Sequence, residues 1–164
     1  MATCLEIGLE SNIDFILFQE PFIYNSNTIS HPAYINILPE NCPRPRVAIF
    51  QAKRSIFNFE LSYSSNDILI INILIDNKKI QLINIYNEKE IGTENSLYTI
   101  ERELIKIKPE KYSIIAGDFN AHHSWWNKKI NNQIRAENLV KWLTELKYEL
   151  LNEPDVSTFY RKGL

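Results

Sequence analysis

The chain has 164 residues, of which 45% are hydrophobic and 23% are charged, and its formal net charge is −2. These proportions are typical of a soluble globular protein and predict one folded domain over residues 1–164. With only four glycines and seven prolines, the chain is not collagen-like or of low complexity. The net charge excludes a strongly basic nucleic-acid-binding tail.

The N-terminal half is predicted to form one short helix and several strands. The helix covers residues 3–11, where leucines recur at helical spacing. The first strand ends before Pro21, which cannot extend a central ladder. Residues 22–45 contain four prolines and are expected to be irregular. The strands are dense or alternating apolar runs, at residues 14–18, 46–51, 55–63, 67–75 and 79–86.

The C-terminal half is predicted to alternate helices and strands. Before it, the polar turn Asp76-Asn77-Lys78 joins the two longest strands into a hairpin. Amphipathic patterns predict helices over residues 95–108 and 133–147. Hairpins combined with helical crossovers favour a mixed α/β sandwich, in which helices cover the sheets. The remaining strands are expected at residues 111–117, 148–151 and 157–160.

The cysteines and the N-terminus bear on the cellular compartment. Cys4 and Cys42 form no C-x-x-C pair, so we expect reduced thiols in an intracellular protein and no zinc signature. Acidic residues occupy the N-terminus where a signal peptide would be apolar. The longest apolar run, residues 68–75, is too short to cross a membrane. The sequence thus predicts a protein that is neither secreted nor inserted in a membrane.

Polar residues follow three of the strands predicted to be buried, and strand ends are where α/β proteins build ligand sites. Glu20 follows the first, Tyr86 ends the second, and Asp118 and Asn120 follow the third. Two carboxylates at strand ends are what a hard divalent cation needs. Each residue also has a structural alternative: Glu20 as a solvated strand end, Tyr86 as a rim aromatic, and the other two as turn formers.

The loop over residues 118–132 contains the pair His122-His123 and the pair Trp125-Trp126. No third soft ligand is nearby, so we do not expect a zinc site. The tryptophans are expected to pin the loop onto the core.

The stretch Gly117-Asp118-Phe119-Asn120-Ala121-His122-His123 resembles the signature of the endonuclease/exonuclease/phosphatase superfamily. Within it, the closest resemblance is to the endonuclease domain of non-LTR, LINE-like retrotransposon polyproteins. The stretch Phe18-Gln19-Glu20-Pro21 resembles the metal-binding strand end of that family. Further segments resemble its later strands in the same order, at residues 46–50, 83–87 and 157–159.

The resemblance implies a four-layer α/β sandwich of the deoxyribonuclease I type that hydrolyses DNA phosphodiesters with Mg²⁺, or alternatively Mn²⁺. Glu20 would bind the metal ion, and Asp118 would orient or deprotonate the attacking water. Asn120 would hold the scissile phosphate, and Tyr86 would donate a hydrogen bond to a phosphate oxygen. Two further residues would line or support the substrate site, His122 and Thr158.

The resemblance also implies partners for the domain, and the sequence departs from the family's pattern at both ends. In a full-length element, the domain would be covalently linked to a reverse transcriptase and would act on DNA in the nucleus. The family's first, asparagine-bearing strand and its last strands, with a serine-aspartate-histidine motif, have no counterpart in the 164 residues. We therefore expect a domain truncated at both ends, with weak or no activity.

Three alternatives remain open. The first is a phosphatase of the same superfamily that acts on a phosphomonoester or on a lipid or inositol phosphate. The second is a catalytically inactive module that binds nucleic acid or a partner, although the net charge argues against tight non-specific DNA binding. The third is an unstable translated remnant. The sequence does not indicate an oligomeric state.

Overall fold

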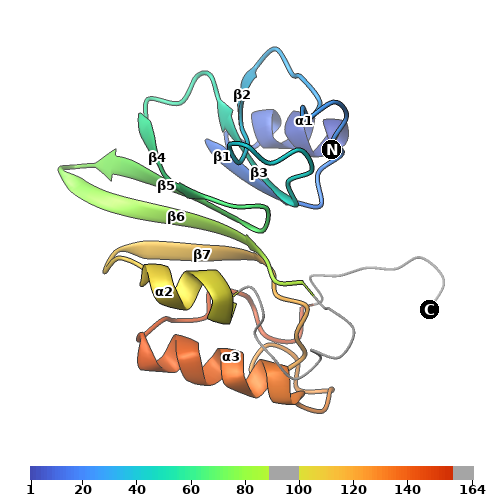
Figure 1. Cartoon of the computed structure of the whole chain (residues 1–164), viewed down its shortest axis with the longest axis vertical. Coiled ribbons are helices and arrows are strands. Elements are labelled where there is room, and N and C mark those ends of the chain that lie inside the picture. The colour runs from blue at the N-terminus through green and yellow to red at the C-terminus, as the bar shows by residue number, and fades with distance from the viewer. Residues whose placement is uncertain (89–99, 157–164) are drawn as a thin grey trace.

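Two β-sheets stacked face to face form the centre of the protein (Figure 1), in a computed structural model that describes residues 1–88 and 100–156. One sheet has the strand order β1-β3-β2 and the other has the order β4-β5-β6-β7. Neighbouring strands are antiparallel except β6 and β7, which are parallel. The strands are β1 (Phe15–Gln19), β2 (Tyr34–Ile37), β3 (Val47–Ala52), β4 (Phe59–Ser64), β5 (Ile68–Ile75), β6 (Lys78–Tyr86) and β7 (Ser113–Asp118).

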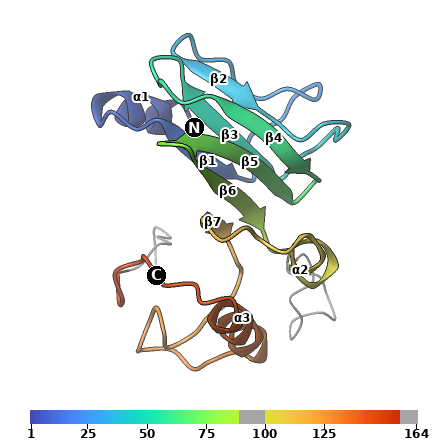
Figure 2. The same ribbon diagram turned by 90° about the vertical axis from the view of Figure 1, so that its left-hand side faces the viewer.

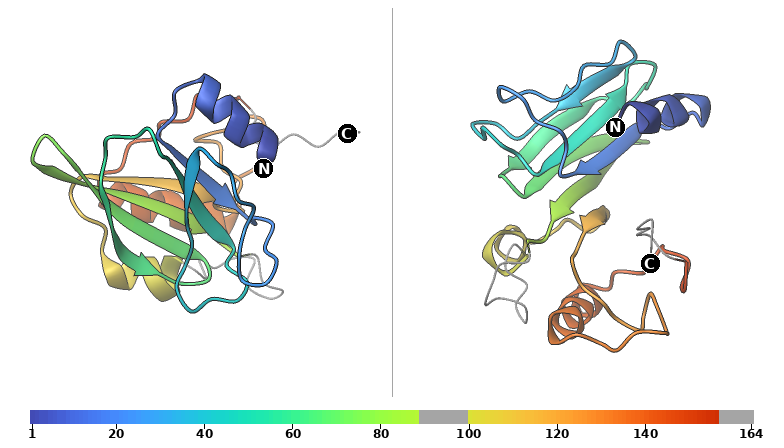
Figure 3. Two further views of the ribbon diagram at one scale, coloured as in Figure 1. Left: turned by 90° about the horizontal axis from the view of Figure 1, so that it is seen from above. Right: turned by 90° about the vertical axis from the view of Figure 1, so that its right-hand side faces the viewer.

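Helices cover the outer face of each sheet (Figures 1 and 2). Helix α1 (Ala2–Glu10) packs on the three-stranded sheet, and α3 (Ile134–Glu145) packs on the four-stranded sheet. A π-helical turn, η1 (Ile100–Leu104), leads into the short α2 (Ile105–Ile107) on the same side as α3. The right-hand view in Figure 3 shows these layers from the side opposite to Figure 2, and the predicted sandwich is confirmed. None of the helices in the described segments is long and apolar enough to span a membrane.

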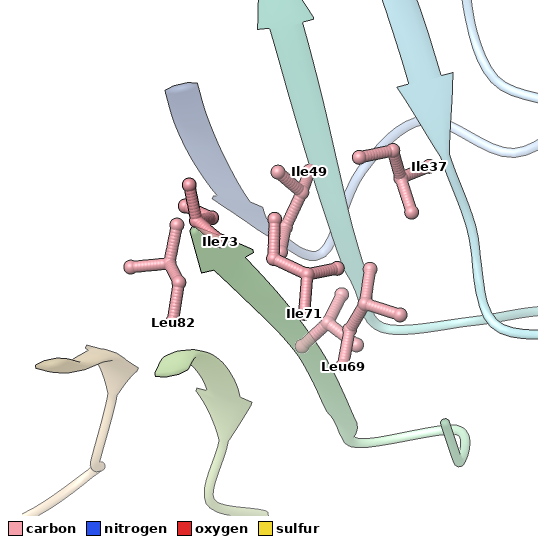
Figure 4. Close-up of a cluster of buried hydrophobic side chains, with 7 residues drawn as sticks. Ile37, Ile49, Leu69, Ile71, Ile73 and Leu82 are labelled. Carbon is pink, nitrogen blue, oxygen red and sulfur yellow. The ribbon is translucent and has the colours of Figure 1, made fainter. Parts of the chain in front are cut away.

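The alternation of side chains along the central strands explains these layers. In β3, where every residue is buried, Val47 and Ile49 point between the sheets while Ala48 and Phe50 pack towards α1. Strand β5 repeats this pattern, with Leu69 between the sheets. A strand buried on both faces reads as a continuous apolar run, which is why these strands were recognisable in the sequence. The cluster between the sheets (Figure 4) contains Ile37, Val47, Ile49, Leu69, Ile71, Ile73 and Leu82.

The β5–β6 hairpin is closed by a two-residue turn. Asp76 and Asn77 have φ values of 50° and 61°, and Ile75 pairs with Lys78 on either side of them. Positive φ at both central residues defines a type I′ turn, whose twist matches that of the flanking strands. The predicted hairpin is therefore confirmed, and the short polar residues that indicated it are those that tolerate this conformation.

Most predicted elements are confirmed to within two residues at each end, but two predictions were wrong. Strand β2 lies inside the segment expected to be irregular. Pro32 and Pro39 flank this strand without entering it, and its outer edge has no partner strand among the described residues. The strand predicted at 148–151 does not form; at its first residue, the N–H of Tyr148 instead donates to the carbonyl of Leu143 at the end of α3.

Two further predictions differ in extent. Strand β4 begins four residues later than expected, at Phe59. Only the last part of the helix predicted at 95–108 falls within the described residues, where it forms η1 and α2. The strand predicted at 157–160 lies outside the described residues.

Asn84 in β6 joins the two sheets and is fully buried. Its Nδ2 donates to the carbonyl oxygens of Phe18 at 3.0 Å and Ala48 at 2.9 Å. Its Oδ1 accepts a hydrogen bond from Gln19 Nε2 at 2.6 Å. One buried amide therefore bonds to both β1 and β3 and fixes where they lie over β6.

We expect Asn84→Ala to lower the free energy of unfolding by about 2–4 kcal/mol, because buried carbonyl groups lose their donor. Denaturation with urea measures this loss. The matched control is Asn72→Ala, since Asn72 is also buried but its Oδ1 has no hydrogen-bond partner among the described residues. Equal losses for the two variants would contradict a bridging role for Asn84.

Candidate active site

Strands β1, β6 and β7 place their last residues at one edge of the sandwich. Tyr86, at the end of β6, is the register partner of Asp118 at the end of the parallel β7. The hydroxyl of Tyr86 donates to Oε1 of Glu20, which follows β1, at 3.1 Å. Tyr86 therefore lies beside both acidic residues. The structure brings Glu20, Tyr86 and Asp118 together although they are far apart in the sequence.

Glu20 is held in an uncommon backbone conformation. Its φ of 47° lies in the left-handed region, which disfavours residues other than glycine, asparagine and aspartate. The surrounding structure holds it there, since its N–H donates to the carbonyl of Arg46 at 2.8 Å. Strained residues of this kind concentrate at functional sites. The conformation ends the strand and leaves the carboxylate exposed to solvent.

Asn120 is hydrogen-bonded to two residues at the site, Asp118 and Asn87. Its N–H donates to Oδ1 of Asp118 at 2.9 Å, and its Nδ2 donates to the carbonyl of Asn87 at 3.2 Å. The first bond is the Asx-type turn that was weighed as a structural role for Asp118. The second oxygen of Asp118 has no hydrogen bond among the described residues, so one carboxylate oxygen remains available for chemistry.

Two buried residues beneath the site were assigned no role from the sequence. Asn87 donates its N–H to the carbonyl of Asp118 at 2.8 Å and its Nδ2 to the carbonyl of Phe119 at 3.2 Å. Arg135, only 1% exposed, donates Nη2 to the carbonyls of Asn87 at 3.0 Å and of Glu88. The position of Asn87 directly after Tyr86 was a usable signal. Arg135 gave none, because a charged residue on an amphipathic helix is expected to face solvent.

Arg135 brings a positive charge beneath the site. Burial lowers the pKa of its guanidinium, and the negative charge of Asp118 acts in the opposite direction. Its Nε and Nη1 have no hydrogen-bond partner among the described residues. This buried cation and the carboxylate of Asp118 therefore attract each other.

A charged network supports Tyr86 from the other side. The guanidinium of Arg46 lies 5.2 Å from the centre of the Tyr86 ring and pairs with Asp67 and Glu88. The buried Asp67 also pairs with Arg102, at 3.1 Å, and its carbonyl accepts the N–H of Tyr86 at 2.9 Å. The ring and backbone of Tyr86 are therefore both held in place.

The environment of Tyr86 keeps its hydroxyl protonated. Burial raises its pKa, the hydrogen bond to Glu20 and the charges of Glu20 and Asp118 raise it further, and only Arg46 acts against them. Because the folded-state pKa exceeds the unfolded value of about 10, the resulting stability is complete below that pH and is lost as the pH rises through the folded-state pKa.

We expect the ultraviolet titration of tyrosinate to show this shift. The difference between the wild type and Tyr86→Phe should be one ionisation with a midpoint above that of the unfolded chain. The same comparison in concentrated guanidinium chloride provides the reference. A midpoint equal to that reference would contradict the hydrogen bond to Glu20.

The remaining predicted site residues are not joined to this cluster. His122 is exposed, and no hydrogen bond or ion pair in the described structure links it to Glu20, Tyr86 or Asp118. Thr158 lies outside the described residues. The buried His123 has a structural role, since it accepts the N–H of Trp125 at 2.9 Å and contacts Trp126 and Glu137. Trp126 packs on the core as expected.

The cluster offers oxygen ligands to a metal ion. Within the described residues, no group of three or more His, Cys, Asp or Glu could hold one. Magnesium, however, needs only one or two protein carboxylates, with water and substrate phosphate completing its shell. The exposed carboxylates of Glu20 and Asp118, both next to Tyr86, fit this requirement.

Comparisons with known proteins identify the family and the fold of the chain. A family model described as endonuclease-reverse transcriptase matches residues 80–163, just over half of the chain. Among solved structures, the chain is similar to the endonuclease domain of TRAS1, a telomere-specific non-LTR retrotransposon, with a TM-score of 0.71 and 23% sequence identity. That match covers 96% of this chain and 69% of the other, and it shows a shared fold. A search of the curated proteins found no match.

Proposed function

Since the chain belongs to the endonuclease-reverse transcriptase family, we propose that it is a non-LTR retrotransposon endonuclease domain that nicks DNA by metal-dependent phosphodiester hydrolysis. Nucleases of this family generally depend on a divalent metal. The observation that carries the proposal is the junction of Glu20, Tyr86 and Asp118 at one edge of the sandwich. A linked reverse transcriptase, DNA as substrate and action in the nucleus are parts of the same proposal.

Glu20 and Asp118 are the residues that would hold the metal ion, Mg²⁺ or alternatively Mn²⁺. A bound ion would offset the charge that develops on the phosphate oxygens during hydrolysis. Asp118 has a carboxylate oxygen free to orient the attacking water or to accept its proton.

Asn120 and Tyr86 would supply hydrogen-bond donors to the phosphate. The amide of Asn120 has two N–H groups, and one of them remains after the bond to the Asn87 carbonyl. Tyr86 has a single proton, which it donates to Glu20. Its donation to a phosphate oxygen therefore requires that bond to break when substrate binds. His122 is proposed to line the substrate groove, and Thr158 is proposed to support the site.

We expect slow turnover from these 164 residues. In the described part of the chain, no histidine is hydrogen-bonded to Glu20, Tyr86, Asp118 or Asn120, so a cationic donor for the leaving oxygen is not among their partners. Removing one donor of this kind lowers rates by about 10²–10³. A plasmid assay that detects a single nick per molecule has the required sensitivity.

The test is conversion of supercoiled plasmid to the open-circular form. Mg²⁺ should support nicking, EDTA should stop it, and excess Mg²⁺ or Mn²⁺ should restore it. Inositol phosphates and a chromogenic phosphomonoester should release no phosphate. Nicking that persists in EDTA, or phosphate release without nicking, would overturn the proposal.

A second measurement does not depend on turnover. Saturating Mg²⁺ should raise the melting temperature of the wild type, because a ligand that binds only the folded state stabilises it. Glu20→Gln should reduce this rise, while the exposed Glu60 on β4 provides the control Glu60→Gln. Equal rises in the three proteins would exclude Glu20 as a metal ligand.

A further inference from the structure

A pocket of about 390 Å³ adjoins Glu20 and is lined by Pro21, Ile23, Arg44, Pro45 and Arg46. Of these residues, only Glu20 belongs to the proposed catalytic cluster. We propose that the pocket binds a backbone phosphate of the DNA strand beside the scissile phosphate, with Arg44 as its cation. This inference rests on the proposed nuclease function and adds a positioning subsite to it.

Arg44 is the cation available for a ligand in this pocket. It is exposed, and among the described residues its guanidinium makes no hydrogen bond or ion pair. Arg46, by contrast, is occupied by Asp67, Glu88 and the ring of Tyr86. An arginine fork matches a phosphate in a bidentate fashion and stays charged at all relevant pH values.

Prolines and hydrogen bonds constrain the backbone around Arg44. Proline at positions 43 and 45 fixes φ there, and Pro45 also restricts Arg44 to extended conformations. Both backbone groups of the next residue, Arg46, are hydrogen-bonded. Its N–H donates to the Asn66 carbonyl at 2.7 Å, and its carbonyl accepts the N–H of Glu20. Such a segment loses little backbone freedom on binding.

The other walls favour a nucleic-acid strand over a free anion. Pro21, Ile23 and Pro45 give the pocket an apolar side. On the same segment, Phe22 and Tyr24 are 65% and 69% exposed, and exposed aromatic rings are platforms on which bases stack. The charge of Glu20 repels phosphate from its end of the pocket, which directs an anion to Arg44.

The test measures DNA affinity in protein that does not cleave. Fluorescence anisotropy of a labelled duplex compares Asp118→Asn with Asp118→Asn/Arg44→Ala over a range of salt concentrations. Loss of one phosphate contact should weaken binding by about tenfold and reduce the slope of log K against log salt by about 0.9. Arg44→Lys should keep the slope while binding less tightly than arginine.

The matched control is Arg54→Ala in the same background, because Arg54 lies beyond the opposite end of β3, where it pairs with Asp14. This control should leave the slope unchanged. If the parent binds duplex and Arg44→Ala changes neither affinity nor slope, the subsite is wrong and the nuclease proposal stands. If the parent binds no DNA at any salt concentration, the proposed function itself fails. Weaker binding of inorganic phosphate with an unchanged DNA slope would make the pocket a free-anion site and overturn the inference.

Discussion

Asp118→Asn is expected to slow plasmid nicking at least about a hundredfold, because a positioned general base contributes about 10²–10⁴ to a rate. The substitution separates the observed role of Asp118 in the turn from its proposed role as the base. Asparagine keeps an Oδ1 that can accept the N–H of Asn120, so the turn after β7 is retained. An amide cannot take a proton from water at neutral pH and is a weak ligand for Mg²⁺.

The control for Asp118→Asn is Asp155→Asn, in another aspartate whose side chain accepts a backbone N–H, that of the sequence-distant Lys128 at 2.7 Å. Both variants should melt near the wild-type temperature, and Asp155→Asn should nick at the wild-type rate. A rate for Asp118→Asn within a few-fold of the wild type would restrict Asp118 to its role in the turn. The base would then have to be another group.

Gly117→Ala is expected to destabilise the protein by at least about 3 kcal/mol, among the larger effects of single substitutions. A Cβ at this position would lie 1.9 Å from the carbonyl oxygen of Ile85, its register partner in β6. The φ of 154° is also one that residues with a side chain rarely adopt. Backbone atoms on both strands would have to separate, which breaks the parallel pair at the point where it carries Tyr86 and Asp118.

Gly8→Ala is the matched control for Gly117→Ala. A Cβ at Gly8 would meet the ends of two side chains, Ile16 Cδ1 at 2.5 Å and Tyr34 Oη at 2.7 Å, and such ends can shift. Alanine also gains about 1 kcal/mol over glycine in a helix interior. Urea denaturation should therefore show a much smaller loss for Gly8→Ala. Equal losses would mean that the contact with Ile85 is relieved at little cost.

The sequence predicted the layered fold because most of its strands have recognisable apolar patterns. Continuous apolar runs marked β3 and β5, which are buried on both faces, and Asp76-Asn77 marked the hairpin between β5 and β6. Strand β2 was missed, since only its first and last residues are buried and its pattern is short. The local sequence pattern was sufficient to predict strands that are buried along their length. It was insufficient for β2, whose structure depends on pairing with one partner strand.

The sequence predicted that three residues of the candidate site lie together, but it did not predict the buried residues that hold them in place. Glu20, Tyr86 and Asp118 stand at strand ends, a position visible in the sequence. The inter-sheet bonds of Asn84 and the burial of Arg135 depend on partners that are distant in the chain. The sequence does not distinguish a buried polar residue from an exposed one, because burial depends on partners elsewhere in the chain. The roles of Asn84 and Arg135 therefore became visible only in the structure.

Glu20 and Asp118 extend from different sheets, one after β1 and the other at the end of β7. Sliding of one sheet over the other would change the spacing of the two carboxylates without altering either residue. If the two carboxylates hold an ion as proposed, ion affinity would be thermodynamically coupled to this sliding, and the bound cation would hold the two layers together. Shortening the side chain of Ile49 or Ile71 should consequently weaken cation binding as well as folding, although both residues are buried between the sheets.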